Sequence, residues 1–168
     1  IKLSRLDEKN SFLEKEWVEL DMLVQDAAER LQHAAEKKNV HLLVDVEPLC
    51  TYGVKPVLAE MAYNLCDNAI RYNRPGGKVN MTLREEDGNA ILEVTDTGIG
   101  IAKEEQERIF ERFYRVDKTR DRETGGTGLG LSITHATIMM HKGSIKVNSK
   151  EEEGTTILVR IPLKQTQA

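Results

Sequence analysis

Apolar and polar positions repeat with a helical period in four segments of the chain. Helices are therefore expected over 22–38, 56–72, 103–113 and 129–141. Leu20-Asp21 offers an N-cap for the first of them, because an aspartate side chain can accept a bond from a free backbone N–H. Pro56 suits the first turn of the second, since its fixed φ matches the start of a helix.

Alternating or β-branched segments lie between these helices. They predict strands around 17–20 and over 41–47, 78–86, 89–96, 144–149 and 155–163. Asp87-Gly88 is typical of a hairpin turn. Because one hairpin lies mid-chain and a second strand pair closes it, a parallel doubly wound sheet is not expected. The pattern predicts a two-layer α/β sandwich, a mixed sheet with helices on one face.

Composition narrows the class of protein. The 168 residues suit one domain, and 39% hydrophobic with 31% charged residues is typical of a soluble globular chain. No apolar run approaches the roughly 18 residues of a membrane helix. A net charge of −4, with scattered lysines and arginines, argues against nucleic acid as the main partner. Cys50 and Cys66 are interpreted as reduced thiols, not a disulfide or zinc site.

Two asparagines on the helix over 56–72 are the first candidate for chemistry. Asn64 and Asn68 are one turn apart beside an apolar stripe, so their amides point the same way. Asparagine costs several tenths of a kcal/mol against alanine inside a helix, so the pair needs a reason. One reading is a pair of solvent-facing amides. The other is a neutral oxygen ligand for Mg²⁺ that shares the ion with phosphates.

Glycine-containing turns supply two further candidates. Asp96 ends a strand and is followed by Thr97-Gly98-Ile99-Gly100, so a flat ligand can approach the backbone and the acid can accept a bond from an exocyclic amine. An ordinary turn is the alternative. Residues 125–132 alternate glycine with other residues before an apolar helix, which favours anion binding at a helix N-terminus. A flexible hinge is the alternative there.

The order of these motifs resembles a known family. The run is N-L-x-x-N-A-x-R-Y at 64–72, D-x-G-x-G at 96–100, F-x-x-F-Y-R at 110–115, G-G-T-G-L-G-L-S at 125–132 and G-T-T at 154–156. Over about 17–164 the chain resembles the ATP-binding catalytic domain of bacterial sensor histidine kinases. That resemblance implies the Bergerat fold, shared with gyrase-type ATPases, heat-shock chaperones and mismatch-repair proteins.

The resemblance also implies roles for particular residues. At the phosphates it implies Asn68 as the Mg²⁺ ligand, Asn64 assisting at the metal or phosphates, Arg71 on phosphate where relatives carry lysine, and Tyr72 beside the nucleotide. At the base it implies Asp96 reading the adenine amino group, Gly98 and Gly100 shaping the pocket, and Thr155 near adenine. In the lid it implies Phe110, Phe113 and Tyr114 as an aromatic anchor, Arg115 reaching the γ-phosphate, and Gly126, Gly128, Leu129 and Gly130 closing over the phosphates.

One substitution separates the branches of this fold group. ATP-hydrolysing relatives typically have a glutamate where this chain has Asn64, and an amide cannot accept a proton from water at neutral pH. Phosphoryl transfer to an external nucleophile depends more on positioning and charge neutralisation than on a base. The resemblance implies Asn64 and Arg115 as the catalytic residues of a kinase. The charged stretch 115–126 is expected to be a mobile lid.

The phosphoacceptor expected of the family is a histidine followed by an acid, and this chain has none. His33, His41, His135 and His141 are followed by Ala, Leu, Ala and Lys. Residues 1–16 resemble the remnant of a dimerisation helix with its linker, and 17–168 the catalytic domain. The expected partners are the phosphoacceptor domain of its own parent kinase and a response regulator receiver domain.

The remaining expectations concern activity and place. The chain is expected to bind ATP and Mg²⁺ in the cytoplasm, within a parent protein anchored in the membrane, without phosphorylating itself. One alternative is a nucleotide-binding or scaffolding module of the same fold that transfers no phosphate. Another is a serine kinase of the anti-sigma-factor type, against which the aromatic positions and the helix remnant argue.

Overall fold

The computed structural model describes residues 14–106, 108–109 and 130–163. Its elements are β1 (Glu16–Glu19), α2 (Leu20–Lys37), β2 (His41–Val46), β3 (Cys50–Gly53), α3 (Lys55–Arg71), β4 (Lys78–Glu86), β5 (Asn89–Asp96), a 3₁₀ turn η1 (Lys103–Glu105), α5 (Gly130–Met140), β6 (Ser144–Lys150) and β7 (Gly154–Pro162). The expected helix remnant at 1–7, most of the linker and the expected lid at 115–126 lie outside the described residues.

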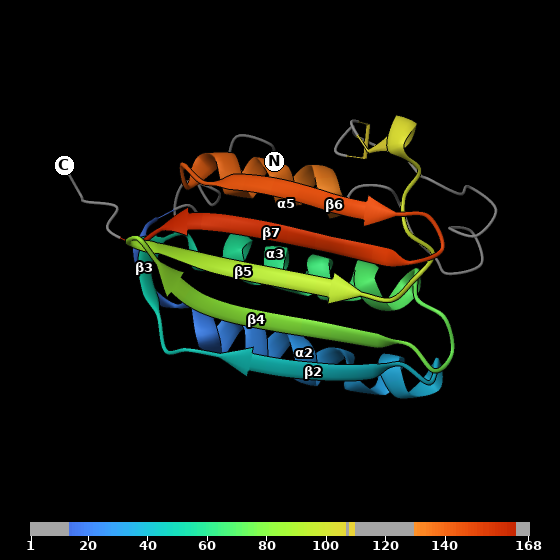
Figure 1. Cartoon of the computed structure of the whole chain (residues 1–168). Helices are drawn as coiled ribbons and strands as arrows, with labels where there is room; N and C mark the ends of the chain where they lie inside the picture. The colour runs from blue at the N-terminus through green and yellow to red at the C-terminus, as the bar shows by residue number, and fades with distance from the viewer. Residues whose placement is uncertain (1–13, 107, 110–129, 164–168) are drawn as a thin grey trace, which may run out of the picture.

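Five strands form one mixed sheet in the order β2-β4-β5-β7-β6. Only β2 and β4 run parallel, and the other neighbours pair antiparallel. The helices α2, α3 and α5 lie together behind the sheet in Figure 1, while the opposite face has no covering helix in the part of the chain that the structure describes. The predicted mixed sheet with helices on one face is therefore confirmed.

The hairpin between β4 and β5 has the boundaries that the sequence predicts. Asp87 and Gly88 both have positive φ, 53° and 78°, which matches the twist of an antiparallel pair. Glu86 pairs with Asn89 directly across this turn. The turn sets the register that carries Asp96 to the far end of β5.

The strand β3 and its pairing were not predicted. Its four residues show no apolar alternation, and they form a separate two-stranded sheet with β1. Thr51 at its centre is fully buried, and its hydroxyl donates to the carbonyl of Pro162 at 3.0 Å. Residues distant in sequence hold this strand in place, so the local sequence pattern does not predict it.

Two helix predictions need correction. The helix α2 begins at Leu20 with Glu19 as its N-cap, and Asp21 lies inside the first turn, where its carboxylate accepts from the backbone N–H of Leu49 at 3.3 Å. Where a helix over 103–113 was expected, residues 103–105 form only a 3₁₀ turn with no buried residue to anchor it. Residues 107 and 110–113 lie outside the described part of the chain.

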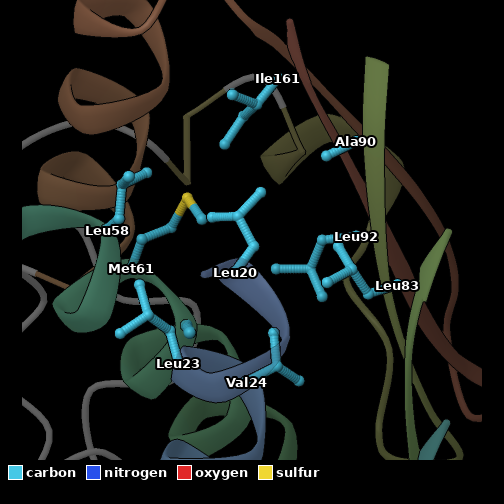
Figure 2. A pocket seen from close by; sticks show the side chains of 10 residues that line it. Leu20, Leu23, Val24, Leu58, Met61, Leu83, Ala90, Leu92 and Ile161 are labelled. Carbon is cyan, nitrogen blue, oxygen red and sulfur yellow. The ribbon is translucent and has the colours of Figure 1, made fainter. Parts of the chain in front are cut away.

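The hydrophobic core lies between the sheet and the three helices. The central helix α3 packs against both α2 and α5, and it contributes Leu58, Met61, Ala62, Leu65, Cys66, Ala69 and Ile70 to the core. Burial raises the pKa of the Cys66 thiol to about 12, so this cysteine stays a protonated apolar filler. A small cavity of about 10 Å³ lies among apolar side chains such as Met61 and Leu92. Figure 2 shows the side chains that line it. A wholly apolar lining offers a water molecule no partner, so we expect the cavity to be dry.

A buried histidine joins the end of α5 to the start of α3. His141 is fully buried; its Nε2 accepts from the backbone N–H of Val54 at 3.0 Å, and Nδ1 lies 2.7 Å from the carbonyl of Thr137. Because Val54 can only donate and the carbonyl can only accept, the ring is neutral with its proton on Nδ1. Burial lowers the pKa of His141 below 6.5. A Cβ on Gly53 would overlap the ring, so glycine gives it room.

Truncating α3 at its buried stripe should unfold the domain more easily. Leu58→Ala is expected to lower the free energy of unfolding in urea by about 2–5 kcal/mol, since it removes a fully buried side chain. The control is Leu43→Ala, where the side chain is 54% exposed, and the expected change is within about 0.5 kcal/mol. Equal losses for the two variants would contradict the assignment of the core.

Acidification should weaken the fold through His141. As the pH falls from about 7.5 to about 5, the unfolded chain protonates this histidine first, so stability present above the unfolded pKa of 6.5 is lost on the way down. The measurement is urea unfolding across that range for the wild type and His141→Gln. The wild type should lose more stability, while other titrating groups act on both proteins. Parallel pH profiles would refute a buried neutral ring.

Candidate functional site

The expected adenine residues meet at one end of the main sheet. Asp96 is the last residue of β5 and pairs directly with Thr155, the second residue of β7. The helix α3 ends at Arg71, with Tyr72 as its C-cap residue. Figure 1 shows the end of β5, the start of β7 and the C-terminal end of α3 at the same end of the molecule.

The turn after Asp96 touches the end of α3 through backbone atoms. The N–H of Ile99 donates to the carbonyl of Tyr72 at 3.0 Å. A Cβ on Gly98 would overlap that carbonyl oxygen, so only glycine allows the approach. The helix that carries the two asparagines and the strand that carries the acid are therefore locked together.

The Asp96 carboxyl is held in a partly buried, weakly polar position. Burial raises its pKa from 3.8 to about 6, against the opposing effect of hydrogen bonds from the backbone N–H groups of Gly98 and Thr155. The Gly98 bond to Oδ1 measures 2.9 Å. Such a carboxylate is a strong acceptor for a ligand N–H, because little water competes for it.

Two glycines with positive φ hold the loop beside this acid. Gly100 has φ +73°, and a Cβ there would overlap the carbonyl of Lys150. Gly154 has φ +122°, and a Cβ there would overlap the carbonyl of Asp96 itself. The loop and the start of β7 thus pass closer to each other than any other residue type would permit.

Ser149 and Gln106 belong to the same neighbourhood and were missed from the sequence. Ser149 Oγ accepts from the N–H of Ile101 at 2.7 Å and lies 2.7 Å from Thr155 Oγ1. The amide of Gln106 donates to the carbonyls of Ile101 and Ser149 at 3.0 and 3.1 Å. A signal existed, because Ser149 continues the inward-facing positions of β6 where an apolar residue is expected.

The asparagines lie on the half-exposed edge of α3, beside its buried stripe. Asn64 and Asn68 are both partly buried, and the carbonyl of Asn68 accepts from the N–H of Tyr72 at 3.1 Å. Four residues of helix rise about 6 Å, so the Asn68 side chain starts one turn from the Tyr72–Gly98 contact. Arg71 Nε pairs with Asp67 at 2.8 Å, and Lys38 donates to the Arg71 carbonyl.

The side-chain atoms available as ligands limit the kind of metal site that these residues can form. Among the described residues, no group of three or more His, Cys, Asp or Glu side chains is placed to hold a metal ion. An all-protein cage is therefore not found there. A pair of amide oxygens does suit Mg²⁺, which keeps several waters and takes further ligands from substrate phosphates.

Several expected site residues lie outside the described residues. They are Phe110, Phe113, Tyr114, Arg115, Gly126, Gly128 and Leu129. Gly130 is described as the first residue of α5, the helix that packs against α3. The mobility expected for 115–126 stays a prediction.

In the described segments, no helix is both long and apolar enough to cross a bilayer.

Known proteins resemble the chain along most of its length. Residues 53–165 match the family described as "Histidine kinase-, DNA gyrase B-, and HSP90-like ATPase". The sensor-like histidine kinase SenX3 of Mycolicibacterium smegmatis is 40% identical over 163 residues, 96% of this chain and 42% of that protein. The sensor histidine kinase RppB of Synechocystis is 39% identical, over 96% of this chain and 36% of that protein. The chain thus spans less than half the length of these relatives.

Solved structures share the fold. The mycobacterial sensor histidine kinase MprB superposes with a TM-score of 0.78 and 29% identity, covering 90% of this chain and 99% of that one. The nucleotide-free catalytic domain of histidine kinase ThkA gives a TM-score of 0.78 and 25% identity, covering 90% and 97%. The two-layer Bergerat sandwich expected from the motifs is therefore confirmed. The chain belongs to the family of histidine kinase-, DNA gyrase B- and HSP90-like ATPases, which bind ATP, and within it resembles the catalytic domains of sensor histidine kinases.

Proposed function

We propose that this chain is the part of a sensor histidine kinase that binds Mg²⁺–ATP and donates its γ-phosphoryl group to a histidine on a dimerisation domain, for relay to a response regulator. The observation that carries the proposal is the junction of Asp96 with the C-terminal end of α3. One partly buried acid and one helix edge with two amides meet there, as recognition of a base and its phosphates requires.

Asp96 recognises adenine in this proposal. Its carboxylate accepts a hydrogen bond from the exocyclic amino group, and Gly98 shapes the pocket by letting the turn pack against the Tyr72 carbonyl. Thr155 lies opposite Asp96 in register and joins it near adenine through a water molecule. Gly100 helps to shape the pocket by letting the loop pack against the Lys150 carbonyl.

The edge of α3 holds the phosphates. Asn68 is the protein ligand of Mg²⁺, and Asn64 one turn earlier assists at the metal or phosphates. When bound, the metal ion neutralises charge on the phosphate oxygens and orients them. Arg71, whose Nε is paired with Asp67 in this structure, turns to contact phosphate, and Tyr72 packs beside the nucleotide.

The transfer step breaks the bond between the γ-phosphorus and the oxygen that bridges to the β-phosphate, while a bond forms from phosphorus to the unprotonated imidazole nitrogen. ADP leaves with the bridging oxygen, and the other ring nitrogen gives up its proton to solvent. Asn64 is no general base, and a neutral imidazole needs none to attack. Arg115 neutralises charge on the γ-phosphate, and Gly126, Gly128, Leu129 and Gly130 close over the phosphates.

The acceptor histidine belongs to another domain. His141 is buried, and the bonds to Val54 and Thr137 occupy both of its ring nitrogens. His33, His41 and His135 lack the acid that follows a phosphoacceptor. The partners are the dimerisation and phosphoacceptor domain of the parent kinase and a receiver domain. The proposal includes a parent kinase that is anchored in the membrane, with this part in the cytoplasm, as the family resemblance implies.

Binding of ATP should depend on pH through Asp96. The ionised carboxylate is the better acceptor, so lowering the pH through about 6 should weaken ATP binding to the wild type. Asp96→Asn should bind about tenfold or more weakly at neutral pH and show a flatter profile below pH 7. Titration of the nucleotide's own phosphates affects both proteins alike, so its contribution to the pH dependence of binding cancels when the two profiles are compared. A pH profile unchanged by the substitution would exclude Asp96 from the site.

Phosphoryl transfer should require a separate acceptor. With γ-labelled ATP and Mg²⁺, the chain alone should gain no label, and a purified dimerisation domain of a related kinase should become labelled on histidine. Asn68→Ala should reduce that labelling at least about tenfold, since it removes a metal ligand. The matched control is Asn80→Ala, exposed on β4. Labelling of the chain itself, or ATP binding without any transfer, would contradict the proposal.

A further inference from the structure

A buried asparagine lies at the junction of Asp96 with the end of α3, and the proposed binding and transfer steps do not use it. Asn73 follows Tyr72 directly after α3, and its exposed fraction is 0%. An amide removed from water is stable only if both of its ends find partners. Its surroundings therefore show what the residue holds in place.

The partners of the Asn73 side chain lie in the turn that follows α3, at the start of β4 and in the Asp96 turn. Oδ1 accepts from the backbone N–H of Arg74 at 2.8 Å and from the hydroxyl of Thr97 at 3.3 Å. Nδ2 donates to the carbonyl of Lys78 at 2.9 Å. The reverse orientation would set an NH₂ group against the Arg74 N–H, so the partners fix the amide's direction.

Hydrogen bonds through Thr97 connect it with Asn73 and Lys78 into a closed ring of three residues. Its Oγ1 accepts from the N–H of Lys78 at 2.9 Å, which leaves its single proton for Asn73. Its own N–H donates to the Lys78 carbonyl at 3.2 Å. A Cβ on Gly77 would overlap Asn73 Oδ1, so the R-P-G-G turn leaves the ring its space.

We propose that Asn73 is a positioning residue of the nucleotide site. Its buried amide holds the Asp96–Gly98 turn against the end of α3, and so sets where the Asp96 carboxylate stands relative to the helix that carries Asn68. The inference rests on the proposed role of Asp96 in reading adenine. Asn73 itself touches neither base nor phosphate in this account.

Two members of the ring adjoin residues of the site. Asn73 follows Tyr72, and Thr97 follows Asp96. Without the Asn73 amide, the Thr97 hydroxyl still accepts from the N–H of Lys78. The hydrogen bond between the Asn73 and Thr97 side chains is lost, however, so the backbone bond from Ile99 to Tyr72 remains to hold the Asp96 turn against the end of α3. The base end of the site is then free to shift against the phosphate end. The loss should fall on recognition of the base rather than on the phosphates.

A comparison of two nucleotides isolates that loss. Inosine triphosphate carries the same phosphates as ATP but replaces the amino group with a carbonyl, which Asp96 cannot accept from. The wild type should prefer ATP, and Asn73→Ala should lower ATP affinity about tenfold while changing inosine triphosphate affinity less than about twofold. Asn80→Ala, on an exposed asparagine of β4, is the matched control and should leave both affinities unchanged.

Two more variants keep the test decisive. Thr97→Val removes the hydroxyl from an exposed residue with little change in shape, and it should reduce the preference for ATP in the same direction. In an Asp96→Asn background, Asn73→Ala should cause no further loss of preference, because its effect passes through the acid.

The outcomes separate cleanly. Equal weakening of both nucleotides by Asn73→Ala would mean that the residue only supports the fold, and the inference would be wrong. If Asn73→Ala does not fold, the Thr97→Val variant provides the test instead. A Thr97→Val protein that prefers ATP as strongly as the wild type would overturn the inference. A wild type that binds both nucleotides equally would remove the proposed role of Asp96 and the inference with it.

Discussion

The contact between the C-terminal end of α3 and the turn after Asp96 is the constraint on which the site depends. One backbone bond, from Ile99 to the carbonyl of Tyr72, joins the central helix to the end of a central strand, and Gly98 permits it. The apolar stripe of α3 is buried against β4, β5 and the neighbouring helices, so rotating the helix would expose it. Its half-exposed edge, with Asn64 and Asn68, is therefore presented in a fixed orientation to whatever Asp96 binds.

Electrostatics at this junction follow from partial burial. The Asp96 carboxyl is shielded enough to raise its pKa to about 6, yet it keeps backbone N–H donors that favour its ionised form. A fully solvated acid would discriminate poorly between a ligand and water. A fully buried one would be protonated at neutral pH and would lose its acceptor strength. The observed balance suits a group that must remain charged and still prefer a ligand to solvent.

Much of the fold could be predicted because it is encoded locally. The hairpin at Asp87-Gly88 and the apolar period of α3 set their own boundaries within a residue. The motif order likewise pointed to the junction of Asp96 with Tyr72 and Thr155. The strand β3 could not be predicted, because Thr51 owes its burial to β1 and to Pro162, more than a hundred positions away. Asn73 escaped notice because polar residues beside a turn are common, and its burial depends on Thr97, 24 positions away. For Ser149 the inward-facing position in β6 was a signal, but it does not show that Ile101 and Thr155 are its partners.

The most direct test is an amide NMR titration of this chain with a non-hydrolysable ATP analogue and Mg²⁺. We expect the largest shift changes among the described residues at Tyr72, at 96–100 and at Gly154-Thr155, with little change at the Asp87-Gly88 turn, which lies at the opposite end of β5. Changes centred on the open face of the sheet or on that hairpin, with the Asp96 turn unaffected, would contradict the account.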